Sequence, residues 1–303
     1  MKRYSFEEIT KCEMCGNPTD NHKILGQRLN QSQGLNPKNK SGISVSIKKC
    51  SNCELIYSSP LPIPENIQDH YGVPPEDYWK PDYFISNPKY YLYEIEIIKG
   101  LLPYKKGMKA LDIGAGIGHA MLALEREGFD VYGFEPSEPF YKKAINVMNI
   151  KPEKIKLGMT ENVEYEDNTF DVITIGAVFE HLYHPSACLK KALAWLKPGG
   201  IIHIEVPSSN YLISKLINLY YSMRGTNYVT NISPMHSPFH LYEFELKSFS
   251  KLENKMNFKI EKIDYHVCEI AFIPKIFHGI FRRYMKLTNT GMQITVYIRK
   301  NSL

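Results

Sequence analysis

The stretch ALDIGAGIGHA, residues 110–120, decides the fold that this sequence predicts. An apolar run ends at Gly114, glycines recur at Gly116 and Gly118, and a helical pattern follows them. A strand, a glycine turn and a helix N-terminus together offer a ligand backbone N–H groups and the positive end of a helix dipole. The stretch therefore indicates a nucleotide-binding turn in an α/β fold, and the neighbouring residues must identify the nucleotide.

Two acidic residues near this turn narrow the choice of nucleotide. A dinucleotide turn reads G-x-G-x-x-G and holds a pyrophosphate, whereas the spacing here is G-x-G-x-G and Asp112 stands just before it. An acid at this point repels a pyrophosphate and attracts an amino group, and no Gly-Lys-Ser/Thr follows that would make a P-loop. Glu135, at the end of the next expected strand, suits both hydroxyls of a ribose. These features predict S-adenosylmethionine, and an NAD-dependent dehydrogenase is the alternative.

From residue 108 onward, strand and helix patterns alternate. We expect strands at 108–113, 130–137, 154–158, 170–179, 201–208, 259–267 and 293–300. We expect helices at 119–128, 138–149, 185–200, 211–223 and 243–252. Strands that alternate with helices predict a mostly parallel sheet with helices on its faces.

Two cysteine pairs of the form Cys-x2-Cys precede this pattern. The pairs are Cys12 with Cys15, and Cys50 with Cys53. Four thiolates fill a tetrahedral zinc site and leave no open position, so we expect a structural Zn²⁺. Four unrelated thiols, or His22 in place of one cysteine, are the alternatives. A proline-rich connector at 58–66 then divides the chain into a small zinc-ribbon-like domain, 1–65, and a second domain, 66–303.

Four motifs in succession resemble the class I S-adenosylmethionine-dependent methyltransferases. They are ALDIGAGIG, VYGFEPS, FDVITIGAVFEHLYHP and LKPGGIIHIEVPS, within a resemblance that covers roughly residues 71–300. The resemblance implies an enzyme with a Rossmann-like, seven-stranded sheet. It implies that Asp112 and the glycine turn hold the methionine part of the cofactor, and that Glu135 binds the ribose. It places Met159 and Thr160 beside the adenine, and Ala177 and Glu180 in the segment that closes the site. Many relatives have Asp where Met159 stands, so the adenine here would rely on backbone and apolar contacts.

The cysteine pairs make the chain similar to the sugar C-methyltransferases of deoxysugar pathways, which have a zinc-binding domain before the methyltransferase domain. This similarity implies a small-molecule acceptor, such as a nucleotide-linked sugar or another saccharide precursor. These enzymes also have a tyrosine-rich region before the glycine turn, where Tyr78 and Tyr83 stand in this chain. We expect these tyrosines to cover the cofactor or orient the substrate, or simply to pack.

The segment HSPFHLYEF, residues 236–244, supplies the candidates for a catalytic base. It follows the fifth strand of the pattern, and segments beyond the carboxyl ends of parallel strands line the ligand crevice. His240 is our first choice, with Tyr242 and His236 beside it, and His181 is the second choice. The structural alternative is that His240 caps the helix that follows.

Charge and hydropathy limit the partners and the location. The net charge of +5 is modest, and neither a membrane span nor a secretion signal is apparent, so we expect a cytoplasmic protein. An RNA methyltransferase is the alternative, with a phosphate contact surface at Lys38, Lys40, Lys48 and Lys49, but no basic stripe spans both domains. A segment at 272–286 mixes apolar and basic residues at helical spacing, which predicts a helix packed on the sheet or a weak contact with a membrane surface. The oligomeric state is not predicted.

Overall fold

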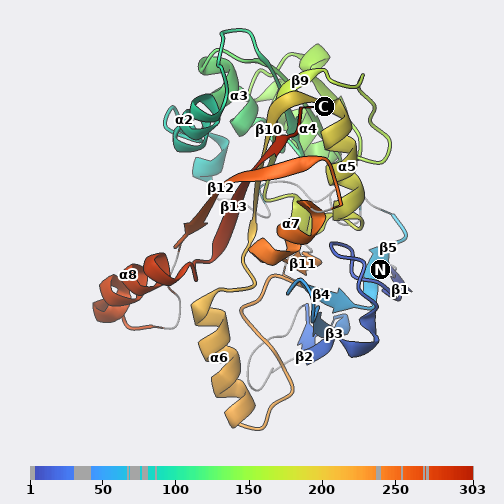
Figure 1. Cartoon of the computed structure of the whole chain (residues 1–303), viewed down its shortest axis with the longest axis vertical. Coiled ribbons are helices and arrows are strands. Elements are labelled where there is room, and N and C mark those ends of the chain that lie inside the picture. The colour runs from blue at the N-terminus through green and yellow to red at the C-terminus, as the bar shows by residue number, and fades with distance from the viewer. Residues whose placement is uncertain are drawn as a thin grey trace.

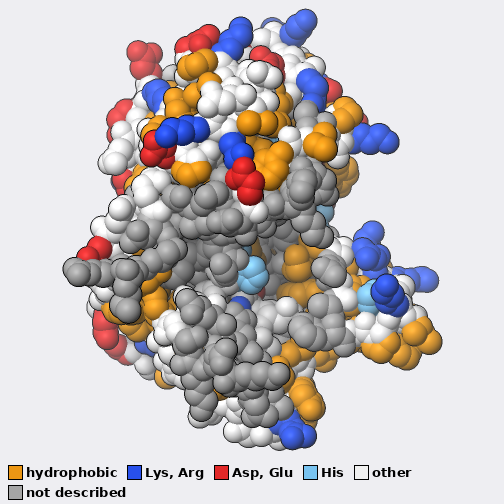
Figure 2. All heavy atoms as spheres, turned by 180° about the vertical axis from the view of Figure 1, so that it is seen from behind, with side chains coloured by type: hydrophobic (Ala, Val, Ile, Leu, Met, Phe, Trp, Pro, Cys, Tyr) orange, Lys and Arg blue, Asp and Glu red, His pale blue; other side chains and the backbone are white. Residues whose placement is uncertain are grey.

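The computed structural model describes residues 4–30, 42–66, 68, 76, 81–85, 87–236, 240–253, 255–268, 270 and 273–302. Figure 1 shows a large sheet with helices in the upper part of the molecule and the N-terminal segment below it. Viewed from behind, the surface is hollowed in the middle, with a histidine side chain in the hollow (Figure 2).

The large sheet has seven strands in the order β12-β13-β10-β9-β6-β7-β8. The strands are β6 (Lys109–Ile113), β7 (Asp130–Glu135), β8 (Ile155–Leu157), β9 (Phe170–Gly176), β10 (Leu196–Pro207), β12 (Phe258–His266) and β13 (Gln293–Lys300). Strands β6 to β10 run parallel, and β13 runs antiparallel to both of its neighbours. The expected Rossmann-like fold is confirmed.

Helices cover both faces of this sheet. They are α2 (Leu92–Leu101), α3 (His119–Arg126), α4 (Glu138–Asn146), α5 (Pro185–Trp195) and α7 (Leu246–Glu253). Two further helices, α6 (Leu212–Met223) and α8 (His278–Thr288), share a separate small core away from the faces of the sheet (Figure 1). Ala110 and Leu111, adjacent in β6, point to opposite faces, as the period of two requires. Ala110 belongs to a core with α2, α3 and α4, and Leu111 to one with α5 and α7. The central strand β6 therefore has an apolar layer on both sides, whereas the edge strand β8 exposes Lys156 and Leu157.

The helix expected at 185–200 is shorter than its pattern indicates. α5 ends at Trp195, and Leu196 already pairs with Phe170 in the sheet. The register of β10 against β9 shifts between Leu196 and Ile201, and this irregularity accommodates Pro198, which lacks an N–H, and Gly199 with a φ of +77°. The Pro-Gly-Gly sequence at residues 198–200 was correctly interpreted as ending the helix, but these residues themselves belong to β10.

The N-terminal segment forms two small sheets. β1 (Tyr4–Glu7) pairs with β5 (Leu61–Pro64), while β2 (Lys23–Leu29), β3 (Ser44–Lys49) and β4 (Ile56–Ser59) lie in a four-stranded sheet completed by β11 (Tyr242–Glu243). In that sheet Tyr242 pairs with Tyr57, and Glu243 with Ile56. A side-chain contact also joins the N-terminal segment to the rest of the chain, since the Ser248 hydroxyl donates a hydrogen bond to the Cys53 carbonyl oxygen at 3.0 Å. Packing therefore crosses the boundary expected at residue 65.

Within the part of the chain that the structure describes, no helix combines the length and the apolar character that crossing a membrane requires.

Candidate active site

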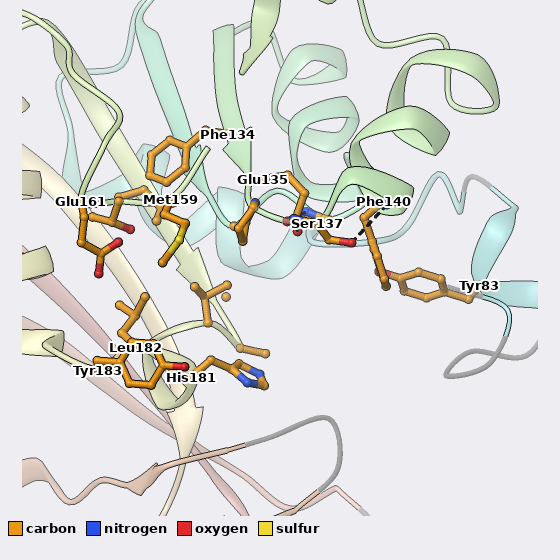
Figure 3. Close-up of a pocket in the computed structure, with 18 of the residues that line it drawn as sticks. Tyr83, Phe134, Glu135, Ser137, Phe140, Met159, Glu161, His181, Leu182 and Tyr183 are labelled. Carbon is orange, nitrogen blue, oxygen red and sulfur yellow. Dashed lines mark hydrogen bonds between the residues drawn. The ribbon is translucent and has the colours of Figure 1, made fainter. Parts of the chain in front are cut away.

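A cavity of about 300 Å³ opens at the carboxyl ends of β6, β7 and β9. Its position is the one where the strand order reverses, between β6 and β9, which is where open α/β sheets bind ligands. Eight residues expected at the site line it: Tyr83, Gly114, Gly116, Glu135, Met159, Thr160, Ala177 and His181. In Figure 3, Glu135 lies between Phe140 and Met159, and His181 projects from the segment after β9.

The glycine turn leaves space toward this cavity. Gly114, Gly116 and Gly118 have φ values of +71°, +56° and +91°, a region that favours glycine. A Cβ on Gly114 would lie 2.4 Å from Val178 Cγ2, so this glycine permits close packing of the turn. A Cβ on Gly116 would meet its nearest atom, the Tyr83 hydroxyl, at 3.6 Å. Gly116 therefore presents its backbone to the cavity, while Gly118 packs against Ile150.

Glu135 links the second strand to the glycine turn. Its Oε2 accepts the Gly116 N–H and its Oε1 accepts the Ser137 N–H, both at 2.8 Å. Burial raises the pKa of Glu135 to about 7, and the two N–H donors oppose this rise. Each carboxylate oxygen can accept more than one hydrogen bond, so Glu135 has acceptor capacity for two hydroxyls of a ligand in the cavity.

Asp112 lies just behind the cavity wall rather than among the residues that line it. Its Oδ1 accepts a hydrogen bond from the Thr174 hydroxyl of β9 at 2.6 Å. Burial raises the pKa of Asp112 to about 7. Burial, and then the charge of Asp112, raise the pKa of Tyr90, which does line the cavity. A cationic group entering between the glycine turn and Tyr90 would favour the ionised form of Asp112.

Histidines gather beside the cavity. The His181 and His240 rings meet edge-on with centroids 4.4 Å apart, and His236 lies 5.4 Å from His240. His240 Nδ1 is 2.6 Å from the Ser233 hydroxyl oxygen, which fixes the orientation of that ring. Burial, then the neighbouring His181, lower the pKa of His240 to about 2, so its imidazole is neutral at pH 7. A pKa this low means that His240 binds a proton only weakly, so it is a poor general base at pH 7.

Glu180 is buried next to the histidines and does not line the cavity. Its Oε2 has no hydrogen-bond partner in the residues that the structure describes, and burial raises the pKa of its carboxyl to about 8. Glu180, His181 and His240 each offer one ligand atom, all within 4.8 Å of one another, so these residues could hold a divalent cation. At pH 7 the Glu180 carboxyl is protonated and the His240 imidazole is neutral.

Tyr242 lies away from the cavity. It is fully buried in β11, and its hydroxyl donates to the Tyr183 carbonyl oxygen at 3.0 Å. Tyr78, the other tyrosine expected near the cofactor, lies outside the described residues. Lys38 and Lys40 also lie outside them, and Lys49 is engaged in an ion pair with Glu54 at 2.8 Å.

Arg28 is a residue that the sequence analysis missed. It belongs to β2 and is 1% exposed, yet its Nε and Nη1 have no hydrogen-bond partner among the described residues. Burial lowers its pKa to about 10, which the charge of Glu243 opposes. The charge of Arg28 contributes to the lowered pKa of His240. The N-terminal segment therefore places a guanidinium near the histidines. In the sequence, the one sign of this role is that Arg28 is the only charged residue of β2 after Lys23.

The four N-terminal cysteines converge, as their spacing indicated. Cys12 Sγ lies 3.5 Å from Cys53 Sγ, Cys15 Sγ lies 3.6 Å from Cys50 Sγ, and all four sulfurs are within 4.8 Å of one another. Zinc–sulfur bonds of about 2.3 Å in a tetrahedron require sulfurs about 3.8 Å apart. The buried cluster therefore fits a zinc ion. His22 is not in it, because its Nδ1 is 2.7 Å from the Tyr57 hydroxyl oxygen.

Comparison with known proteins identifies the sheet and its cavity. Residues 90–263, more than half of the chain, match a family model described as a methyltransferase domain. An uncharacterized methyltransferase of Schizosaccharomyces pombe is 34% identical over 110 residues, 32% of this chain and 39% of the relative. A ubiquinone biosynthesis O-methyltransferase of Coxiella burnetii is 28% identical over 133 residues, 43% of this chain and 54% of the relative. The aligned regions thus span about two fifths to about half of these relatives.

Solved structures share the fold. A SAM-dependent methyltransferase from Methanosarcina mazei has a TM-score of 0.50 and 17% identity, covering 68% of this chain and 98% of that one. An N-methyltransferase of Haemonchus contortus, solved with phosphomonomethylethanolamine and S-adenosylhomocysteine, has a TM-score of 0.52 and 18% identity, covering 82% and 63%. At these identities the likeness shows the fold alone.

Proposed function

The chain belongs to the methyltransferase-domain family, and we propose that it is an S-adenosylmethionine-dependent methyltransferase. The cavity beside Gly116 and Glu135 holds this cofactor, and the acceptor is a small anionic molecule. Glu135 accepts the two ribose hydroxyls, and the methionine part lies over the glycine turn, where Asp112 stabilises its amino group. Met159 and Thr160 contact the adenine. The observation that carries this assignment is the Gly116–Glu135 hydrogen bond at the cavity wall.

The histidine cluster acts on the acceptor. The sulfonium supplies an activated methyl group, so the protein must mainly orient the acceptor and exclude water, which contributes up to ~7–11 kcal/mol. His181 lines the cavity and accepts the proton that a hydroxyl or carbon acid releases as the new bond to the methyl carbon forms. His240 holds the His181 ring from the side, and Ser233 holds His240. We assign His181 as the base and His240 as a positioning residue, and we assign Tyr242 to packing.

The buried guanidinium of Arg28 supports an anionic acceptor. A buried charge without its hydrogen bonds is unfavourable, and the planar fork of arginine fits a phosphate or carboxylate. Two nitrogens of Arg28 find no partner in the part of the chain that the structure describes, and Arg28 lies close enough to His240 to lower the pKa of that histidine. A nucleotide-linked sugar or another phosphorylated saccharide precursor would match this cation, in keeping with the similarity to sugar C-methyltransferases.

The N-terminal segment, residues 1–65, has a structural role in this proposal. A zinc ion at Cys12, Cys15, Cys50 and Cys53 fastens β2, β3 and β4, and this sheet carries Arg28 toward the acceptor. Because all four positions around the ion are thiolates, none remains for a substrate, and the zinc takes no part in methyl transfer.

The proposal is tested by an acceptor screen with labelled S-adenosylmethionine. Nucleotide-linked sugars, uncharged sugars and RNA are offered to the wild-type protein and to Arg28→Met. We expect transfer to an anionic sugar, with a KM that rises in Arg28→Met while the affinity for S-adenosylhomocysteine stays unchanged. Transfer to RNA, or to an uncharged sugar with equal efficiency in both proteins, would contradict the proposed acceptor class.

A further inference from the structure

Two helices at one end of the molecule expose apolar side chains. Of the sixteen large hydrophobic side chains that are exposed among the described residues, nine lie on α6 or on α8 and the turn before it. On α6 they are Leu216, Leu219, Tyr220 and Met223, and near α8 they are Ile276, Phe277, Ile280, Tyr284 and Leu287. Their exposed fractions range from 41% to 81%. We call these nine residues the apolar stripes.

Helical spacing puts each stripe on one face. Leu216, Leu219 and Met223 are related by i, i+3 and i+7, and Ile280, Tyr284 and Leu287 by i, i+4 and i+7. The opposite faces of the two helices share a small core that includes Ile213, Met285 and Phe281. The helices thus support each other from the inside and present both stripes outward. The helix predicted at 272–286 is present, but most of its large apolar side chains are exposed.

The two segments that carry the stripes contain cations and no acids. Residues 206–242 and 270–303, which contain both helices, include no aspartate or glutamate. Six exposed cations lie on these helices or beside their ends: Lys215, Arg224, Lys275, Arg282, Arg283 and Lys286. Arg282 and Lys286 line a hollow that also contains Glu94, Glu261 and Asp264, whereas the other cations do not line it. None of the six forms an ion pair with any carboxylate in the described parts of the chain. Figure 2 shows blue and orange side chains together on the lobe of α8 at the right, and orange ones along α6 below it.

We propose that the apolar stripes and their cations dock this protein on the surface of an anionic membrane. Helices that lie in the interface bury an apolar face at the level of the headgroups and place basic residues beside it. Tyrosine and phenylalanine suit that boundary, and Tyr220, Phe277 and Tyr284 supply them. An apolar patch flanked by unpaired cations, on segments that contain no acid, matches anionic lipid better than it matches a second copy of itself, because two such surfaces would repel. The inference does not depend on the identity of the methyl acceptor.

Vesicle sedimentation tests the proposal. The full chain is mixed with vesicles of phosphatidylcholine alone or of phosphatidylcholine with phosphatidylglycerol. We expect binding to the anionic vesicles that weakens as salt is added. The double variant Ile280→Ser with Leu287→Ser should lose about tenfold or more in partitioning. The double variant Arg283→Gln with Lys286→Gln should lose about fivefold for each cation, on anionic vesicles.

A matched pair of changes controls for exposed apolar surface in general. Val147 and Leu157 are each 48% exposed and lie at α4 and β8, away from the stripes. Val147→Ser with Leu157→Ser should bind vesicles like the wild type. Folding of every variant is verified by S-adenosylhomocysteine binding and circular dichroism. Failure of the wild type to bind anionic vesicles, or equal losses in the control, would overturn the proposal. So would a wild-type dimer in lipid-free buffer that Ile280→Ser with Leu287→Ser dissociates, since the stripes would then be a subunit interface.

Discussion

Replacing Gly116 by alanine separates the strain in the glycine turn from its contact with the cofactor. Gly116 has a φ of +56°, where an alanine costs roughly 1–2 kcal/mol of the free energy of folding. The added Cβ would lie 3.6 Å from the Tyr83 hydroxyl and 3.8 Å from Phe140 Cδ1, so the empty protein accommodates it. A bound cofactor would need the same space. Overpacking of about 1–3 kcal/mol corresponds to a Kd about five- to 150-fold higher.

Gly107 provides the matched control. Its φ is +88°, and a Cβ there would have no atom within 4 Å. It precedes β6 at the amino end of the strand, whereas Gly116 follows the carboxyl end. Gly107→Ala should therefore lose similar stability to urea and bind S-adenosylhomocysteine like the wild type in calorimetric titrations. Equal affinities in Gly116→Ala and Gly107→Ala would refute the placement of the cofactor against Gly116.

Three further changes test the site and the metal cluster. Between about pH 4 and pH 7 the folded protein, in which the pKa of Asp112 is raised to about 7, binds the Asp112 proton more tightly than the unfolded chain does, so the free energy of unfolding declines as the pH rises. Asp112→Asn should remove this part of the decline, which is up to about 1.4 kcal/mol per pH unit for a single group. Urea titrations of the variant over this pH range that match the wild type would contradict the burial of Asp112. Cys50→Ser should abolish the zinc content of the purified protein and lower its melting temperature, whereas Cys268→Ser, outside the cluster, should retain one zinc per chain by metal analysis. His181→Ala should lower kcat about 10²- to 10⁴-fold with unchanged affinity for S-adenosylhomocysteine, and the exposed His184→Ala should match the wild type; a modest effect of His181→Ala would exclude it as the base.

Local patterns were enough to predict the sheet. The strand, turn and helix around Gly116 and the following alternation depend on neighbours in the sequence, so apolar periodicity and glycine positions reveal them. The spacing of the four cysteines also predicted their convergence, because each pair forms one compact half of the cluster. Helix ends were less certain, as Leu196 shows: a Pro-Gly-Gly sequence stops a helix whether or not the same residues then enter a strand.

Contacts between distant segments were not predictable in the same way. Tyr242 was a plausible active-site residue because it follows the fifth strand of the pattern, but it pairs with Tyr57 in the N-terminal sheet. The approach of Arg28 to His240 depends on how this sheet packs on the rest of the chain, and no local pattern encodes that arrangement. The edge-on contact of His181 with His240 is likewise a product of tertiary packing.

A crystal structure with S-adenosylhomocysteine tests the central claim most directly. The account predicts the ligand in the cavity at the carboxyl ends of β6 and β7. Both ribose hydroxyls should donate hydrogen bonds to the Glu135 carboxylate, and the ligand should contact the backbone of Gly116. The sulfur should face the side of the cavity that His181 lines. A ligand bound elsewhere, or one whose ribose does not contact Glu135, would contradict the account.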